Sequence, residues 1–335
     1  MKNYLKLSLI LERFVGSWHV LLNAIFLGRS KPEKLKNFIL GLFLFLSATS
    51  FLSAQDFYFD HYKVEDGLSH NTVISSLQDQ KGFLWFGTKN GLNRFDGYTF
   101  RLFQNDPDTP KSLKGNYVEC LHEFDNTIWV GTDNGLFRYN DRFENFDIVE
   151  NTANTQIFDI ENDTLGNLWY IGESTLYKYN VAQKKVDSFP PKDFFNATNI
   201  IRSQNNEIWV ASTNALFLYI KETDSFKKYV LDIPADIKHP FRINSLFNLD
   251  THTILLGTQN HGVLAFDSNK GKIKNINPLS GETYYVRDFA LREKDELWVA
   301  TESGLHIYNL ATGGYTNLKK NYETRTPYPT MRYIL

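Results

Sequence analysis

Two pairs of neighbouring carboxylates come closest to a catalytic arrangement in this sequence. Glu161 lies two residues before Asp163, and Asp295 adjoins Glu296. Two carboxylates that flank one glycosidic bond can divide the acid and base steps of its hydrolysis. Both pairs fall in predicted turns between strands, where carboxylates are usually solvated. We therefore predict that they are turn residues and not a catalytic pair.

Histidine and cysteine are the other residues that could hold a metal ion or attack a substrate. The eight histidines are dispersed, and His252 with His261 does not have the spacing of a known metal site. Cys120 is the only cysteine, so no intramolecular disulfide can form, and its apolar neighbours predict a buried structural thiol. The sequence also lacks a nucleophile elbow, a phosphate loop and a dinucleotide fingerprint. We predict no metal, no cofactor and no catalytic residues.

One motif returns six times and sets the expected architecture. Its first copy reads LWFGTKNGLNRFD from Leu84, and its second reads TIWVGTDNGLFRYN from Thr127. The same slot is held by Trp85, Trp129, Trp169, Trp209, Leu255 and Trp298. A period of about 40 to 45 residues is typical of a four-stranded propeller blade. The sequence therefore predicts an all-β protein, a β-propeller with six complete blades.

Four strands can be assigned within the first copy. We expect Val73–Asp79 to be innermost, followed by Leu84–Thr88, Gly91–Phe95 and the outermost Thr99–Phe103. The second strand is apolar on both faces, which is typical of a strand between two neighbouring blades. The tryptophan slot is therefore predicted to pack blades together. An Asn-Gly pair at Asn90 predicts a tight hairpin turn between the second and third strands.

The overall composition favours sheet and disfavours some partners. Aromatic residues make up 15% of the chain, and they favour pleated, half-buried surfaces. The formal net charge is only -2, so no nucleic-acid partner is expected and nothing draws the folded protein to an anionic membrane. Membrane contact is expected only through an export segment or through parts that this chain lacks.

The first 54 residues are predicted to be an N-terminal extension with an export signal. Residues 31–54 combine a basic stretch, an apolar run of 15 residues from Phe38 to Leu52 and a small residue at Ala54. This is the layout of a secretory signal peptide, so we expect cleavage after Ala54 and a periplasmic domain over residues 55–335. The alternative is a lasting membrane anchor. Residues 1–30 are interpreted as an over-called start, with a second hydrophobic element as the alternative.

The segment that leads into the first copy carries a family resemblance. It reads FDHYKVEDGLSHNTV from Phe59 to Val73, directly before the first blade motif. Together with the repeats, it resembles the two-component regulator propeller family over roughly residues 57–335. That resemblance implies the periplasmic sensor region of a hybrid two-component system histidine kinase. In such systems an immunoglobulin-like domain, one membrane helix and the kinase follow, and the ligands are oligosaccharides released from polysaccharides.

The two ends of the repeat region look like parts of one further blade. Met331–Leu335 aligns with the innermost-strand slot of Val73–Leu77, and Phe57–Tyr62 matches the outermost-strand pattern. We therefore expect an incomplete seventh blade, in a ring of six and a half blades or an open arc. We infer a truncated or split product of a larger sensor, which lacks the kinase itself.

The ring geometry limits where a small molecule could bind. Loops that enter the innermost strands share one face with the hairpins between second and third strands, around the central channel. Amide, guanidinium, hydroxyl and aromatic groups there could bind sugar hydroxyls and stack on a sugar ring. The alternative is that they only rim the channel. The candidate positions are Thr72, Tyr117, Gln156, Asn199, Arg242 and Tyr285.

Three functions remain open at this point. The first is a non-catalytic sensor domain that binds an oligosaccharide and shifts a homodimer between two arrangements. The second is a secreted propeller enzyme acting on glycans, which would place two convergent carboxylates at the channel mouth. The third is a protein-binding scaffold, which would expose large apolar patches. The family resemblance favours the sensor.

Overall fold

The computed structural model describes residues 59–190, 196–232, 241–277 and 284–318. All of them belong to the second of two compact units, Phe59–Leu335. The extension expected over residues 1–54 and the cleavage after Ala54 lie outside the described residues. Within the described ranges, no helix has both the length and the apolar character needed to cross a membrane.

Six antiparallel sheets of four strands follow one another along the chain, after a short 3₁₀ helix η1 (Val64–Asp66). Blades 1 to 3 contain β1 (Val73–Gln78), β2 (Leu84–Thr88), β3 (Gly91–Phe95), β4 (Phe100–Phe103), β5 (Val118–Phe124), β6 (Thr127–Thr132), β7 (Gly135–Asn140), β8 (Asn145–Ile148), β9 (Ile157–Asn162), β10 (Asn167–Gly172), β11 (Thr175–Asn180) and β12 (Lys185–Phe189). Blades 4 to 6 contain β13 (Asn199–Arg202), β14 (Ile208–Ala211), β15 (Ala215–Ile220), β16 (Ser225–Val230), β17 (Ile243–Asn248), β18 (Thr253–Thr258), β19 (Val263–Asp267), β20 (Lys272–Asn275), β21 (Val286–Arg292), β22 (Glu296–Thr301), β23 (Gly304–Asn309) and β24 (Tyr315–Leu318).

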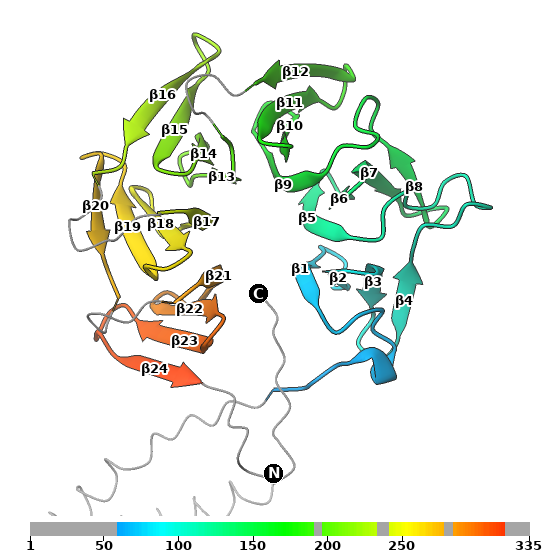
Figure 1. Ribbon diagram of the computed structural model, residues 1–335, viewed down its shortest axis with the longest axis horizontal. Helices are drawn as coiled ribbons and strands as arrows, with labels where there is room; N and C mark the ends of the chain where they lie inside the picture. Colours follow the sequence, from blue (N-terminus) through cyan, green and yellow to red (C-terminus); the bar gives the residue numbers. More distant parts are fainter. Residues whose placement is uncertain (1–58, 191–195, 233–240, 278–283, 319–335) are drawn as a thin grey trace, which may run out of the picture. The chain divides into compact units, whose positions relative to one another are not determined.

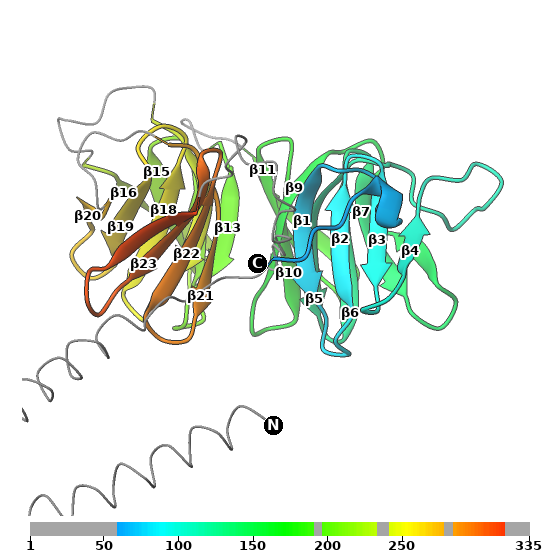
Figure 2. The same cartoon turned by 90° about the horizontal axis from the view of Figure 1, so that it is seen from below.

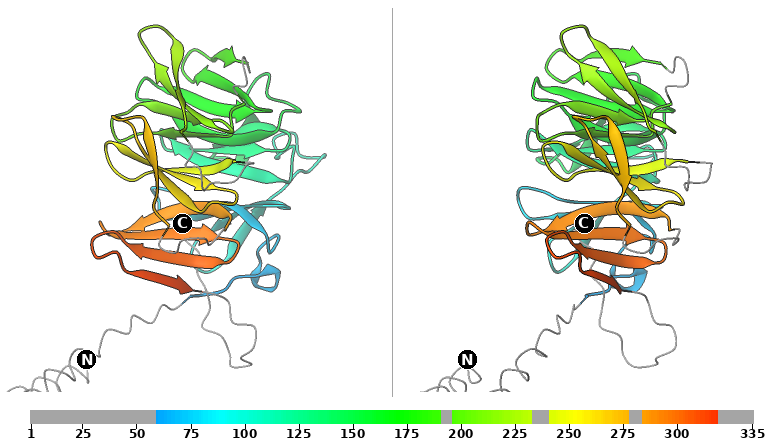
Figure 3. Two further views of the ribbon diagram at one scale, coloured as in Figure 1. Left: turned by 60° about the vertical axis from the view of Figure 1, so that its left-hand side comes forward. Right: turned by 90° about the vertical axis from the view of Figure 1, so that its left-hand side faces the viewer.

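The six sheets stand around one axis, as expected for a β-propeller (Figure 1). In each blade the first strand lies nearest the axis and the fourth lies at the periphery. Figures 2 and 3 show the same sheets from the side, with their faces turned toward one another around the ring. The predicted fold class and the six complete blades are confirmed.

Apolar clusters join the successive blades from blade 1 to blade 6. Five such clusters are present among the described residues, one at each of the five seams between blades 1 and 6. Trp85 meets Tyr139 of the next blade edge to face, with ring centroids 4.9 Å apart. Trp169 meets Tyr219 in the same way at 4.7 Å. The tryptophan slot therefore packs blades together, as its sequence pattern predicts.

The expected seventh blade is not seen in the described part of the chain. The segment Phe59–Tyr62, predicted as part of an outermost strand, is in no strand. Its Tyr62 ring instead packs against Phe95 and Phe100 of blade 1, at centroid distances of 5.0 and 5.7 Å. The other predicted half, Met331–Leu335, lies outside the described residues.

The prediction that both carboxylate pairs are solvated turn residues is wrong for three of the four side chains. Asp163 does lie in a turn but is only 7% exposed. Glu161 belongs to strand β9, and Glu296 begins strand β22. Asp295 alone is an exposed turn residue. Asp163 is buried and the two glutamates are half-buried, and all three carboxylates accept hydrogen bonds that offset the cost of removing them from water.

Candidate functional site

Five of the six predicted site residues occupy one equivalent position in their blades. Each directly precedes an innermost strand, and its carbonyl oxygen accepts a hydrogen bond from the N–H that follows the second strand. The pairs are Thr72 with Lys89 (3.4 Å), Tyr117 with Asp133 (3.0 Å), Gln156 with Glu173 (3.4 Å), Arg242 with Gln259 (3.0 Å) and Tyr285 with Glu302 (3.2 Å). This bond holds the five positions at one end of the ring, beside the turns between second and third strands.

Asn199 does not share that position, which corrects the sequence alignment of blade 4. It is the first residue of strand β13 and pairs with Ala211. Its side-chain amide donates to the carbonyl oxygen of Asn244 in the next blade, at 2.9 Å. The amide nitrogen is therefore used in a contact between blades 4 and 5.

Glu119, on the innermost strand of blade 2, binds Gln156 of blade 3 and acts electrostatically on Tyr117. The Gln156 Nε2 atom donates a 2.5 Å hydrogen bond to Oε1 of Glu119. Burial raises the pKa of the Glu119 carboxyl; the hydrogen bond from Gln156 opposes that rise, and the negative charge of Asp133 adds to it. The group therefore presents a partly desolvated carboxyl flanked by a phenol and an amide.

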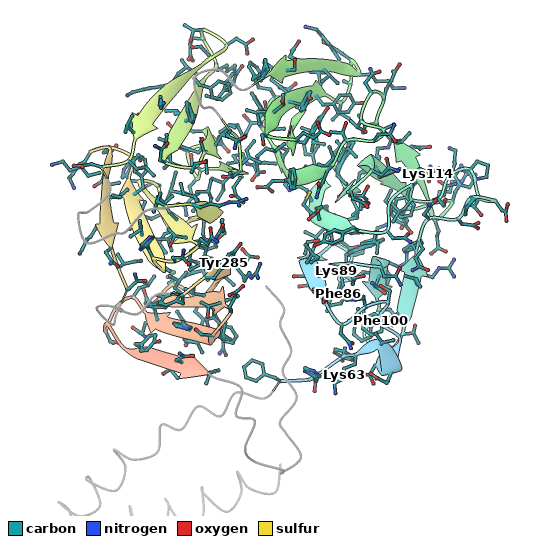
Figure 4. All side chains as sticks on the ribbon, in the orientation of Figure 1. Lys63, Phe86, Lys89, Phe100, Lys114 and Tyr285 are labelled. Carbon is teal, nitrogen blue, oxygen red and sulfur yellow. The ribbon has the colours of Figure 1, made fainter. Side chains whose placement is uncertain are left out.

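Tyr285 is held on the opposite side of the mouth by a stacked cation. The guanidinium carbon of Arg287 lies 4.2 Å from the centroid of the Tyr285 ring. The same guanidinium forms a 2.6 Å ion pair with Oε1 of Glu302. Figure 4 shows Tyr285 at the inner end of blade 6, beside the axis. The stack limits the freedom of the phenol ring and leaves a flat surface with polar groups next to it.

The two groups are close enough to influence each other electrostatically. Burial raises the pKa of the Tyr117 phenol, the charge of Glu119 raises it further, and the charge of Arg287 lowers it. We call the six residues of these two groups the mouth cluster. Its members are Tyr117, Glu119, Gln156, Tyr285, Arg287 and Glu302. Three of the six were not predicted from the sequence.

The three missed residues share a signal that the sequence does carry. Glu119 and Arg287 stand two residues after Tyr117 and Tyr285, at the points where the pairing of the first and second strands shifts register. Glu302 follows strand β22, at the turn whose N–H binds the Tyr285 carbonyl. Thr72 and Arg242, by contrast, are exposed rim residues whose side chains take no part in the cluster's contacts.

Deeper along the axis, two aspartates have raised pKa values. Burial raises the pKa of Asp159 to about 7, against hydrogen bonds from the backbone N–H groups of Ile160 and Ile200, and the charge of Asp288 adds to the rise. Desolvation on the innermost strand β21 also raises the pKa of Asp288, although this residue remains exposed. Among the described residues, no group of three or more His, Cys, Asp or Glu side chains is arranged to hold a metal ion.

Comparison with known proteins bears on the repeat as well as the ring. The family model described as "Two component regulator propeller" matches residues 67–90, which span η1's cap, β1 and β2. The match covers the first half of blade 1 and stops before β3. The family resemblance inferred from the sequence is thereby confirmed. Over 72 residues, 22% of its length, the chain is also 42% identical to Histidine kinase P4 of Formosa agariphila.

Solved structures similar to this chain include an extracellular domain of a two component system and a lyase. The extracellular domain of the hybrid two component system BT4673 from B. thetaiotaomicron matches 82% of the chain with a TM-score of 0.69 and 23% identity. A virginiamycin B lyase from Staphylococcus aureus matches 75% of the chain, and 85% of its own, with a TM-score of 0.58 and 13% identity. The chain spans 5% of the kinase and 36% of the BT4673 chain. At these identities the structures show the fold alone.

Proposed function

We propose that this propeller is the ligand-sensing input domain of a hybrid two-component regulatory system. In this proposal the chain is exported to the periplasm, its signal peptide is removed after Ala54, and the mouth cluster binds an oligosaccharide. The family repeat and the similarity to an extracellular sensor domain support the sensor role. The kinase that receives the signal lies outside this chain.

The mouth cluster supports a sugar ligand through its mixture of groups. The Tyr285 ring offers a flat apolar face, and the guanidinium of Arg287 fixes its orientation. The amide of Gln156 and the carboxyl of Glu119 offer hydrogen-bond donors and acceptors at the same end of the propeller as Tyr285. Pyranose rings expose apolar C–H faces and polar hydroxyl edges, so stacking and hydrogen bonding are needed together. The stacked Tyr285–Arg287 pair is the observation that carries this proposal.

Signalling in this proposal requires a change of arrangement on binding. A ligand that binds one of two arrangements of a homodimer more tightly shifts the population toward it. The homodimer is part of the proposal, and sedimentation of the exported chain with and without the ligand measures it.

An enzyme is the second candidate, because Asp159 on the innermost strand of blade 3 has a pKa of about 7. A carboxyl with that pKa suits acid or base catalysis near neutral pH. However, the Asp159 carboxylate already accepts hydrogen bonds from the backbone N–H groups of Ile160 and Ile200. The bond from Ile200 joins blade 4 to blade 3 and favours a structural role for Asp159, so we propose that the chain is not an enzyme.

Calorimetric titration of the exported chain with a panel of purified oligosaccharides tests the function. Product analysis of each mixture by mass spectrometry is run in parallel. Saturable binding with the sugar recovered intact supports the sensor. Cleavage or elimination of the sugar would establish the enzyme instead, and absence of binding across the panel would reject the oligosaccharide proposal.

A further inference from the structure

On one face of blade 1, a residue is exposed whose counterparts in other blades are buried. The first residue of the innermost strand is fully buried in blades 2, 3, 5 and 6, at Val118, Ile157, Ile243 and Val286. In blade 1 the same position is Val73, which is 41% exposed. The preceding blade covers this residue elsewhere in the ring, so Val73 marks a face that no described blade covers.

A second series of positions breaks at the same face. The residue after the tryptophan slot is at most 2% exposed in the five other blades, at Val130, Tyr170, Val210, Leu256 and Val299. The corresponding Phe86 of blade 1 is only half-buried. Figure 4 places Phe86 and Phe100 on the side of blade 1 that is turned toward blade 6. Their rings pack together at a centroid distance of 6.1 Å. The face is therefore aromatic and spans β2 and β4.

The opposite wall of this seam, on blade 6, shows a matching break. The position two residues after the tryptophan slot is buried in every other blade, at Gly87, Gly131, Ile171, Ala211 and Gly257. In blade 6 it is Ala300, which is only half-buried. No apolar cluster joins blade 6 to blade 1 among residues 59–190, 196–232, 241–277 and 284–318.

The seams between blades 1, 2 and 3 show which side chain packs against the residue two positions after the tryptophan slot. A Cβ atom built on Gly87 would lie 3.1 Å from Cβ of Val118, the first innermost-strand residue of the next blade. A Cβ atom built on Gly131 would lie at the same distance from Cβ of Ile157. The small residue of one blade thus receives the first innermost-strand side chain of the next blade. Ala300 stands where such a side chain would be received.

The chain itself contains a segment of the required pattern and reach. Between eight residues (149–156) and 14 residues (104–117) separate an outermost strand from the next innermost strand in the described blades. Twelve residues (319–330) separate Leu318, the end of β24, from Met331. Met331 begins the apolar sequence MRYIL, which aligns with the innermost-strand slot of Val73–Leu77.

We propose that Met331–Leu335 binds in the seam between blades 6 and 1 as an additional innermost strand, with Met331 packed against Ala300. Residues 319–335 lie outside the described part of the chain, so this contact is an inference from the other seams. Burial of the Met331 side chain against Ala300 supplies the stabilisation, because removing apolar area from water favours the folded state. The proposal is independent of any ligand at the mouth cluster.

Disulfide trapping in the full chain tests the proposed contact. With Cys120→Ser removing the native thiol, Ala300→Cys is combined with Met331→Cys and the folded protein is oxidised with oxidised glutathione. The Cβ atoms of disulfides lie about 3.5–4.5 Å apart, close to the spacing expected at this position. We expect loss of both free thiols and an intramolecular crosslink between two tryptic peptides. The pair Ala211→Cys with Ile243→Cys, which belong to one buried cluster of the seam between blades 4 and 5, serves as the positive reference.

The matched control replaces Met331→Cys by Arg332→Cys, whose side chain points to the other face of a strand. Equal trapping of this control, or no trapping at Met331 while the reference pair forms, overturns the proposal. A crosslink between two molecules would assign the seam to a second copy and also overturn it. Thermal unfolding gives an independent measurement: Met331→Asp should lower the Tm, and Arg332→Asp should leave it within error.

Discussion

The indole nitrogen of Trp85 donates a 2.8 Å hydrogen bond to Oδ2 of Asp79. The second oxygen of that carboxylate accepts the backbone N–H groups of Lys81 and Phe83. One turn residue therefore binds both its own turn and the residue that packs two blades together. The tryptophan slots of three other blades have the same kind of partner, in the pairs Trp169 with Asp163 (2.9 Å), Trp209 with Glu207 (3.1 Å) and Trp298 with Glu296 (2.7 Å).

Removal of this carboxylate is predicted to destabilise the ring. Asp163→Ala deprives the buried Trp169 indole and the N–H groups of Leu165 and Asn167 of their acceptor. A buried donor left unsatisfied costs about 1–3 kcal/mol, so we expect a loss of roughly 2–4 kcal/mol in the free energy of unfolding, measured by urea titration. Asp250→Ala is the matched control, because its exposed carboxylate binds only backbone N–H groups of its turn. A loss at Asp163 no larger than that at Asp250 would contradict the prediction.

A cation that bridges two blades is the second target. Lys178 of blade 3 has a side chain that is 15% exposed, and its Nζ atom lies 2.7 Å from Oδ1 of Asp224 and 3.1 Å from the Tyr219 hydroxyl in blade 4. Because Asp224 is largely solvated, we expect Lys178→Met to cost only about 1 kcal/mol in unfolding free energy. Lys185→Met breaks an exposed ion pair with Asp187 and should change the stability by less than about 0.5 kcal/mol. Equal effects of the two substitutions would show that the bridge between blades contributes nothing.

The fold was predictable from the sequence because the blade motif is local. The Asn-Gly turn at Asn90 joins two strands of one blade, and the repeated tryptophan packs that blade against the next one. Both features recur along the chain with the period of one blade. Asn199 was predicted to precede the innermost strand but belongs to it, because blade 4 lacks the register shift found in the other blades. In the five other blades the pairing of first and second strands shifts register at one point near the mouth, whereas β13 pairs with β14 without a shift. A one-residue irregularity of this kind has no clear sequence signature.

The role of turn carboxylates could not be deduced for a different reason. Asp163 is either solvated or accepts a hydrogen bond from the Trp169 indole, depending on how its turn is placed relative to strand β10. Blade 2 shows the contrast: its turn has only Asp125 and Asn126, both with positive φ (51° and 54°). The buried indole nitrogen of Trp129 has no acceptor in the part of the chain that the structure describes. The turn that contains Asp163 is longer, residues 163–166, so the length of the turn and its geometry separate the two blades.

The stacked tyrosine at the mouth gives a prediction for ligand binding that rests on the proposed function. Tyr285→Ala removes the flat ring and leaves Arg287 paired with Glu302. An aromatic contact contributes about 0.5–1.5 kcal/mol beyond its buried area, so we expect a loss of roughly tenfold in affinity for the oligosaccharide, measured by calorimetry. Tyr98→Ala is the control, because Tyr98 is 91% exposed in the turn between β3 and β4. Unchanged affinity in the Tyr285 variant would place the ligand elsewhere.

The Asp159 carboxyl should make the stability of the ring depend on pH between about 4 and 7. Its pKa in the folded chain is raised from 3.8 to about 7, mainly by burial. In that pH range the folded state binds more protons at this site than the unfolded state does, so its contribution to stability falls as the pH rises. Asp159→Asn keeps an oxygen that can accept the Ile200 N–H and removes the titration. We expect the variant to gain stability relative to the parent as the pH rises from 4 to 8, measured by urea unfolding at each pH.

Asp224→Asn provides the control of opposite sign for this prediction. Hydrogen bonds from Lys178 and Tyr219 lower the pKa of Asp224, so its contribution is present near neutral pH and is lost as the pH falls through the lowered value. The Asp224 variant should therefore lose stability relative to the parent near neutral pH and approach it in acid. Asp159→Asn could instead lose stability relative to the parent as the pH rises, or differ from it by the same amount at every pH. Either result would show that the carboxyl is ionised throughout, and that the hydrogen bonds from Ile160 and Ile200 outweigh its burial.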